Sequence, residues 1–237
     1  FHDPCGLRTV YYTEYEGRIH LGSQPLIFEH IMPVEAGNRF ISYGESEYKK
    51  NHLEHWIPSG CSLYEGIHHL VPNHYLRFST RAQIRYWPNR YIQRRPLDDA
   101  VHEASALLEK LMQAGNARYK LALPLTAGWD TRTLLSACRN IADNVFFYTL
   151  QYRRLQLESS DIRIPRKILQ SLGYRHHVLD CRKSPDAEFA VIYERNTPMA
   201  HLDDWGWIAY GMMGTYPSER LCLKGNCSEI CRCFYYK

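Results

Sequence analysis

Residues 121–132 read Leu-Ala-Leu-Pro-Leu-Thr-Ala-Gly-Trp-Asp-Thr-Arg. The apolar run at 120–125 predicts a buried strand, and residues 131–141 predict a helix, so a tight turn of small residues joins the two. In open α/β sheets, ligands bind beyond the carboxyl ends of the strands. A helix that begins there offers free backbone N–H groups and the positive end of its dipole. We therefore expect a ligand-binding loop between this strand and this helix.

The same alternation of strand and helix continues on both sides of this stretch. Further helices are predicted at 97–115, at 165–172 (beginning at Pro165), within 184–197 and within 204–213, and further strands at 145–150, 176–180 and 220–224. Strands that alternate with helices imply a parallel sheet covered on both faces. We therefore predict an α/β fold for residues 97–237.

Residues 1–96 have a different pattern, rich in strands and loops. A hairpin is predicted from the β-rich run at 7–12, the turn signal Glu16-Gly17 and the alternating run at 18–21. The basic and aromatic stretch at 85–96 is interpreted as an interdomain linker, with a stacking surface for a single strand of nucleic acid as the alternative. The prediction is a smaller, β-rich α+β piece before a domain boundary near residue 97.

Composition excludes several classes of protein. Of 237 residues, 45% are hydrophobic and 23% charged, which is ordinary globular usage and excludes disorder or a coiled coil over the whole chain. No apolar run reaches the roughly 18–20 residues of a membrane helix, so we expect a soluble, cytoplasmic protein without a membrane partner. A net charge of +4 is too weak to indicate a nucleic-acid partner.

Cysteine and histidine spacing gives two weaker signals. Cys222, Cys227, Cys231 and Cys233 lie within twelve residues, but structural zinc sites normally use paired knuckles set further apart. We expect thiols rather than zinc there. The pairs His68-His69 and His176-His177 are interpreted as packing and surface residues rather than metal ligands.

The loop itself carries residues suited to a polyphosphate. Ala127 and Gly128 let an anion approach the backbone, and Thr126 and Thr131 add hydroxyl donors. Asp130 beside a polyphosphate suits a ligand of Mg²⁺, which bridges carboxylate and phosphate oxygens. The alternative is an ordinary turn in which Asp130 caps the helix.

This loop resembles the pyrophosphate loop of the asparagine synthetase family, whose usual form is Ser-Gly-Gly-x-Asp-Ser; here it reads Thr126-Ala-Gly-Trp-Asp-Thr131. Other stretches match the family in order along the chain. They are Asp3-Pro-Cys-Gly-Leu-Arg-Thr-Val-Tyr-Tyr12 with Leu21-Gly-Ser-Gln24, Gly66-Ile-His-His-Leu-Val-Pro-Asn-His-Tyr-Leu76 with Tyr86-Trp87, Ser160-Asp161 through Leu172-Gly173 with His176-His177, and Gly225-Asn-Cys-Ser-Glu-Ile230.

The resemblance implies a fold and a reaction. Residues 1–96 would be the C-terminal part of a glutaminase-like domain of the N-terminal nucleophile type, and residues 97–237 a Rossmann-like ATP-binding domain of the pyrophosphate-loop type, truncated at its C-terminus. In the family, a substrate carboxylate attacks the α-phosphate of ATP, and an amine or ammonia then attacks the acyl-adenylate. The implied partners are a small-molecule carboxylate and a nitrogen donor, with a homodimer left open.

The resemblance also implies roles for individual residues. Asp130 and Glu229 would hold Mg²⁺, and Leu125, Leu150 and Gly225 would border the ATP. Asn226 stands where the family carries a Glu that is its candidate general base, and Asn cannot accept a proton at neutral pH.

Other departures concern both halves of the chain. Ala127 replaces the first Gly of the loop, Trp129 is bulky for its position, and Glu229 replaces an Asp. Gln24 stands where the family usually has Glu, and Cys5 is not at the N-terminus, so we expect no glutamine hydrolysis by this chain. Two alternatives stay open: a glutamine-independent carboxylate-activating or cyclising relative, and a non-catalytic nucleotide-binding protein.

Overall fold

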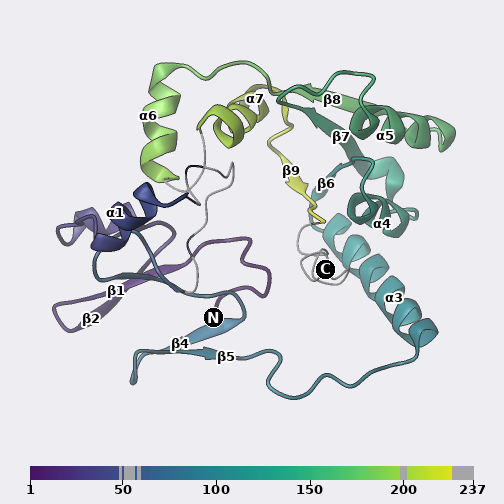
Figure 1. The fold of residues 1–237 in the computed structure, drawn as a ribbon. Coiled ribbons are helices and arrows are strands. Elements are labelled where there is room, and N and C mark those ends of the chain that lie inside the picture. The colour runs from purple at the N-terminus through teal and green to yellow at the C-terminus, as the bar shows by residue number, and fades with distance from the viewer. Residues whose placement is uncertain (48–49, 51–56, 58–59, 198–201, 226–237) are drawn as a thin grey trace. The chain divides into compact units, whose positions relative to one another are not determined.

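The computed structural model describes residues 1–47, 50, 57, 60–197 and 202–225. The chain groups into two compact units (Figure 1). The first contains residues 1–93 together with helix α6, Ala187–Asn196, and the second contains residues 94–186 and the chain from Asp203 onward. Helix α6 thus groups with the first unit, although the sequence pattern assigns it to the second domain. The assignment of the two parts to named domain types stays a prediction.

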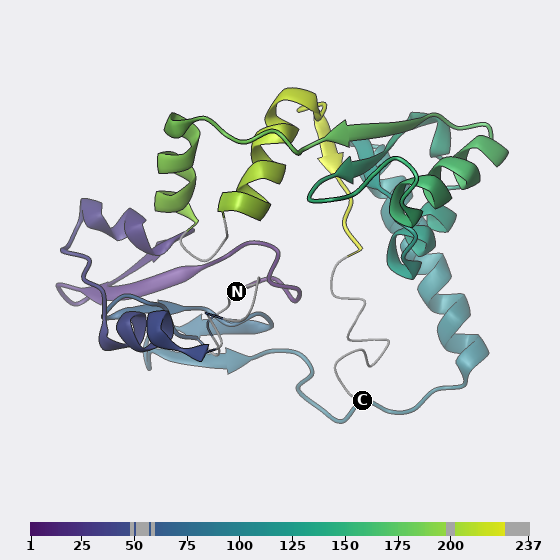
Figure 2. The same ribbon diagram turned by 45° about the horizontal axis from the view of Figure 1, so that its top comes forward.

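The second unit is built on a four-stranded, fully parallel sheet in the order β8-β7-β6-β9, with helices between the strands (Figure 2). This confirms the α/β fold class and the parallel sheet predicted from the sequence. The elements are α3 (Leu97–Asn116), β6 (Lys120–Pro124), α4 (Trp129–Ala137), the 3₁₀ turn η2 (Ala142–Asn144), β7 (Val145–Gln151), α5 (Ser160–Ser171), β8 (His176–Asp180), the π-helical turn η3 (Leu202–Gly206), α7 (Trp207–Thr215) and β9 (Arg220–Cys222).

Alternating side chains of the sheet pack against helices on its two faces. On one face, Leu121 and Leu123 of β6 pack with residues of α3, α4 and α5. On the other face, Ala122 and Tyr148 pack with Ile208 of α7. Both faces are buried, which explains why these strands read as continuous apolar runs rather than as alternating ones.

Helix α7 approaches the sheet unusually closely at one glycine. A Cβ at Gly211 would lie 2.6 Å from Cα of Cys181, which follows β8. Real Cβ atoms do not approach other atoms so closely, so any larger residue at 211 would push α7 off the sheet. The Cys181 side chain beneath it is 1% exposed.

Helix α5 differs from its prediction. The sequence predicts a helix that begins at Pro165, but α5 begins at Ser160 and Pro165 lies inside it. Proline inside a helix removes one backbone hydrogen bond. Here Ile162, Pro165 and Leu169 share one buried face, and the burial of that face compensates for the lost bond. The earlier start also brings Asp161 to the first turn of the helix.

The first unit consists of two small antiparallel sheets and short helices. One sheet has the strand order β2-β1-β3, and the other is the hairpin β4-β5. Its elements are β1 (Tyr11–Tyr15), β2 (Arg18–Gly22), the 3₁₀ helix η1 (Pro25–His30), α1 (Asn38–Glu45), β3 (Ile67–His69), β4 (His74–Arg77) and β5 (Ala82–Arg85). Glu16 and Gly17 both have positive φ, 51° and 72°, as a tight two-residue hairpin turn requires.

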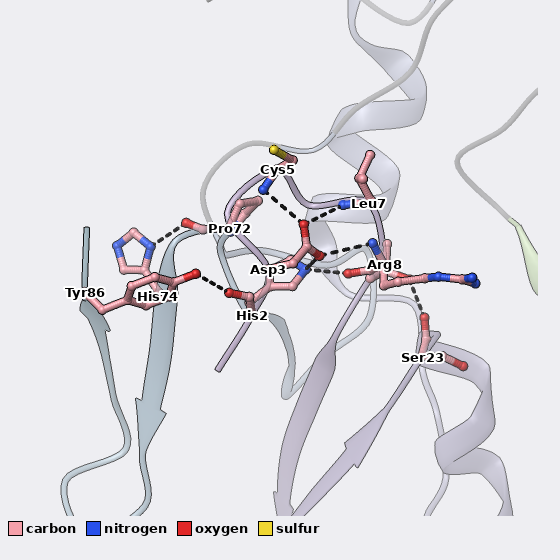
Figure 3. A network of polar contacts seen from close by, with 10 residues as sticks. His2, Asp3, Cys5, Leu7, Arg8, Ser23, Pro72, His74 and Tyr86 are labelled. Carbon is pink, nitrogen blue, oxygen red and sulfur yellow. Dashed lines mark hydrogen bonds and ion pairs between the residues drawn. The ribbon is translucent and has the colours of Figure 1, made fainter. Parts of the chain in front are cut away.

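The first strand begins later than its prediction, at Tyr11 instead of Leu7. Figure 3 shows the reason: the Asp3 carboxylate accepts the backbone N–H groups of Cys5 and Leu7 at 3.0 Å and that of Arg8 at 3.3 Å. A side chain that binds nearby N–H groups in this way folds the backbone into a local turn and competes with strand pairing. Desolvation raises the pKa of Asp3, but these N–H groups and the nearby His2 outweigh it and lower the pKa below its ordinary value.

We predict that Leu169→Ala in α5 lowers the free energy of unfolding by about 2–5 kcal/mol, because Leu169 is fully buried in the core between α5 and the sheet. The matched control is Leu172→Ala at the end of the same helix, where the side chain is 53% exposed. The control should change stability by no more than about 0.5 kcal/mol. Urea unfolding followed by circular dichroism measures both, and equal losses would contradict this packing.

Candidate functional site

The loop between β6 and α4 lies at the carboxyl edge of the sheet, and its first residue is fixed by the neighbouring strand. The Leu125 N–H donates to the Tyr148 carbonyl of β7 at 2.7 Å, and the Leu125 carbonyl accepts the Thr149 hydroxyl at 2.6 Å. The Leu125 side chain is 1% exposed and belongs to the hydrophobic core. Leu125 therefore anchors the loop through its backbone.

Three consecutive N–H groups of the loop bind side-chain oxygens. The Thr126 N–H donates to the Thr131 hydroxyl at 3.2 Å, the Ala127 N–H to the Asp161 carboxylate at 3.1 Å, and the Gly128 N–H to the Thr126 hydroxyl at 3.1 Å. Each donor thus faces an oxygen supplied by a side chain that can rotate. Helix α4 begins directly after Gly128, which provides no side-chain cap of its own. The loop is a set of N–H donors at a helix start, and the chemistry of such a set suits an oxyanion.

Strand β9 brings a second segment to this loop. β9 pairs in parallel with β6, and a Cβ at Gly225 would lie 3.2 Å from the Cβ of Asp130. The structure therefore places Gly225 beside Asp130, two residues that the family resemblance assigns to one site. Asn226 and Glu229, the other two residues assigned to this second loop, lie outside the described residues.

The remaining residue of the predicted nucleotide site, Leu150, is half-buried near the end of β7 and packs on the sheet face that α7 covers. Leu125 packs on the opposite face, with α3, α4 and α5. Their side chains therefore do not share one side of a binding pocket. A nucleotide bordered by both residues would have to lie at the edge of the sheet, with Leu125 and Leu150 on opposite faces.

Two polar residues beneath the loop, Thr149 and His176, form a hydrogen bond that the sequence analysis did not predict. Thr149 donates its only hydroxyl hydrogen to Leu125, so it must accept from Nε2 of His176 in β8, which lies 2.8 Å away. Nδ1 of His176 is then without a hydrogen, buried and without a hydrogen-bond partner in the described part of the chain. The three strands β8, β7 and β6 are thus joined by hydrogen bonds that end at the first residue of the loop.

This arrangement keeps His176 neutral. Burial, together with the positive charges of Arg166 and His177, lowers the pKa of His176 to about 4. Protonation would place a new N–H at the buried Nδ1, for which the described residues supply no acceptor. The prediction that His176 is a packing residue is incomplete, because its ring also positions Thr149.

The start of α4 carries an exposed aromatic residue. Trp129 is 69% exposed, and the Arg132 guanidinium lies 4.6 Å from the centre of its ring while Nε of Arg132 donates to the Gly128 carbonyl at 3.1 Å. The bulky side chain is therefore largely in solvent, and Arg132 links its ring to the loop backbone.

A metal centre is not assembled by the described residues alone. Within them, no three His, Cys, Asp or Glu side chains come close enough together to hold an ion. Asp130 is the described member of the predicted Mg²⁺ pair. In the predicted thiol region, Cys222 lies with its sulfur 3.2 Å from the Tyr148 hydroxyl, and Cys227, Cys231 and Cys233 lie outside the described residues.

No described helix has the length and apolar character needed to cross a membrane.

Comparison with solved structures finds distant likenesses, among them one to a synthetase. The chain is similar to the glutamine-dependent NAD⁺ synthetase from Acinetobacter baumannii, whose structure was solved in complex with ADP, at 13% sequence identity and a TM-score of 0.40. The match covers 73% of this chain and 32% of the synthetase, so the chain spans about a third of that protein's length. No family model and no curated protein matches the chain. A likeness of this size carries no argument about function, which rests on the site itself.

We predict that His176 makes stability fall as the pH is lowered from about 6.5 to about 4. The folded-state pKa, about 4, lies below the ordinary value of about 6.5, so in this window the unfolded chain binds one more proton than the folded chain. The slope from this residue is at most about 1.4 kcal/mol per pH unit. His176→Gln can still donate to Thr149 and should lose this part of the slope. Urea midpoints across the window measure it, and parallel profiles for the two proteins would show that His176 does not titrate as described.

Proposed function

We propose that the second unit binds ATP with Mg²⁺ at the loop 125–131 and uses it to activate a carboxylate for amide formation. The observation that carries this proposal is the row of N–H donors on Thr126, Ala127 and Gly128, each bound to an oxygen, at the start of α4 and the carboxyl edge of a parallel sheet. Phosphate oxygens would replace the side-chain oxygens that these donors now bind.

The chemistry follows from the leaving group. Attack of a carboxylate on the α-phosphate of ATP forms an acyl–phosphate bond and breaks the bond between the α- and β-phosphates, so pyrophosphate leaves with its negative charge. Fixed N–H donors stabilise that charge where it develops. Because the donors lie on consecutive residues of one loop, they suit adjacent oxygens of a di- or triphosphate.

Mg²⁺ would supply further charge neutralisation. Asp130 lies in the first turn of α4 beside Gly225, at the junction of the two segments that the family resemblance assigns to the metal site. Asp130 and Glu229 are our proposed metal carboxylates. A protein usually supplies one or two carboxylates to a nucleotide-bound Mg²⁺, and phosphate oxygens complete the coordination shell.

The finer proposal is a carbon–nitrogen ligase of the asparagine synthetase type, with an amine or ammonia as the nitrogen donor. It is supported by the order of the family-like stretches along the chain and by the approach of Gly225 to Asp130. Asn226 in place of a general base argues for a slow second step, because it cannot take the proton of the attacking amine.

A second candidate function is nucleotide binding without catalysis. It is favoured by Asn226, which stands where the family carries its candidate general base. The Asp161 carboxylate bears on either candidate, because it binds the Ala127 N–H at 3.1 Å and so occupies a donor that a phosphate would need. A carboxylate in that place also repels an incoming phosphate. ATP binding therefore requires Asp161 to turn away, or to share the metal with Asp130.

We predict that ATP binds the chain in the presence of Mg²⁺ and that Asp130→Asn weakens this binding by at least about tenfold, because the variant loses a carboxylate on the metal. Asp99→Asn is the matched control: it removes an exposed carboxylate in the first turn of another helix of this unit, α3. Isothermal calorimetry with and without Mg²⁺ measures both.

Two results would contradict the proposal. One is the absence of ATP binding by the wild-type chain, and the other is equal affinity in wild type and Asp130→Asn. If the full reaction is reconstituted, its products show which phosphate bond of ATP is broken. Pyrophosphate supports the proposed cleavage between the α- and β-phosphates, whereas ADP as the sole nucleotide product would exclude it.

We predict that Asp161→Asn strengthens ATP binding by about fivefold, since an amide can still accept the Ala127 N–H but no longer repels phosphate. Asp203→Asn in η3 serves as a control for the change in net charge. A loss of affinity in Asp161→Asn would mean that this carboxylate binds the metal instead of competing with the nucleotide. Calorimetric titration with Mg²⁺ and ATP distinguishes the two outcomes.

A further inference from the structure

The opposite, amino-terminal edge of the sheet carries two cavities that the proposed function does not use. Their volumes are about 460 and 240 Å³, and Asp143, Asn144 and Arg220 line both. Arg118 and Lys120 line the larger cavity, and Arg175 and His177 line the smaller one. These residues lie at the starts of β6, β7, β8 and β9.

Arg220 is held in place at the junction of the two cavities. Its Nη1 donates to the carbonyls of Leu121 and Asn144, both at 3.0 Å, and its side chain is 23% exposed. Those acceptors are neutral, and the carboxylate of Glu219 forms only a long ion pair with Arg220, 4.0 Å from Nε. The guanidinium is thus oriented and partly desolvated, and among the described residues its one ion pair is the long one to Glu219, so it can still bind an anion.

The smaller cavity adds two groups beside Arg220. The His177 ring stacks on Phe146 with centroids 4.2 Å apart, and the Arg220 guanidinium lies 5.8 Å from the same Phe146 ring. Burial, and then the positive charges of Arg175 and Arg220, lower the pKa of His177. Arg175 and Arg220 are thus both close enough to act electrostatically on the His177 ring.

The negative ends of nearby helices are a simpler explanation for why positively charged side chains gather at this edge. α3 ends at Asn116 and α5 at Ser171, and a helix C-terminus is equivalent to about half an elementary negative charge. Two helix ends with Asp143 and Glu219 would then offset about three of the four positive charges of Arg118, Lys120, Arg175 and Arg220. The helix ends and the two carboxylates together offset most of the cluster but leave an excess of about one positive charge.

We propose that this amino-terminal edge is a second binding site, and that it takes the phosphate group of a small anionic molecule. Arg220 and Arg175 would hold the phosphate, with Lys120 at the mouth of the larger cavity and the Phe146–His177 pair forming an aromatic wall. A guanidinium presents several N–H donors in a plane that matches phosphate oxygens.

This site is separate from the ATP loop. β6 runs from Lys120 at the amino edge to Pro124 at the carboxyl edge, and these two residues are about 13 Å apart along an extended strand. A small anion cannot reach both ends, so the two sites can be tested independently and the failure of one says nothing about the other.

The experiment is an NMR titration of the full chain with inorganic phosphate at fixed pH, observing the imidazole signals of His177, which His177→Gln assigns. A parallel arm uses glycerol 2-phosphate to separate free phosphate from a phosphate ester. Phosphate should shift the His177 signals and raise the pKa of this histidine, because it neutralises Arg175 and Arg220. The other charged groups around the ring, Asp143 and Glu219, are the same in both states.

Arg175→Gln removes an exposed cation of the site and should weaken phosphate binding about 5- to 20-fold. Lys167→Gln, an exposed cation on α5, is the matched control and should leave the affinity unchanged. Binding of both probes supports a phosphate ester as the ligand, and binding of inorganic phosphate alone supports free phosphate. No shift of the His177 signals, or equal weakening in Arg175→Gln and Lys167→Gln, would overturn the proposal.

Discussion

The parallel pairing of β6 with strands on both sides is the constraint on which the second unit depends. β6 pairs with β7 from Leu121 to Pro124 and with β9 from Lys120 to Ala122. Since all these strands point the same way, whatever follows each of them emerges at one edge. The loop after β6 and the segment after β9 meet there for that reason, although nearly a hundred residues separate them in the sequence.

The rigidity of that edge comes from polar bonds placed inside an apolar sheet. Thr149 and His176 are both at least half-buried, and a buried hydroxyl or imidazole is costly unless it is bonded. Their bonds end on the Leu125 carbonyl, so the energetic requirement to satisfy them also fixes the backbone from which the loop departs. In this way a core requirement and a binding requirement are met by the same atoms.

The sequence was sufficient for the architecture and only partly for the site. Apolar runs located β6, β7 and β8, because burial on both faces leaves an unambiguous pattern, and helical periodicity located α3. The start of α5 was missed because Pro165 is a strong local signal for a helix start, whereas the burial of Ile162 is a property of the packed fold. Thr149 could have been noticed as a hydroxyl within an apolar strand, but its partner His176 is 27 residues away. Asp161 is 34 residues from the N–H that it binds, a distance that no local pattern encodes.

The close approach of Gly211 to Cys181 has a consequence for the chemical reactivity of the protein. Thiol reagents attack the thiolate, and burial, followed by the charge of Asp180, raises the pKa of Cys181 to about 11. With the backbone of α7 lying directly over the sulfur, neither a reagent nor a hydroxide ion reaches it while the helix is docked. The rate at which Cys181 is alkylated under native conditions is therefore limited by how often α7 separates from the sheet. Alkylation of this thiol thus reports on the local opening of α7.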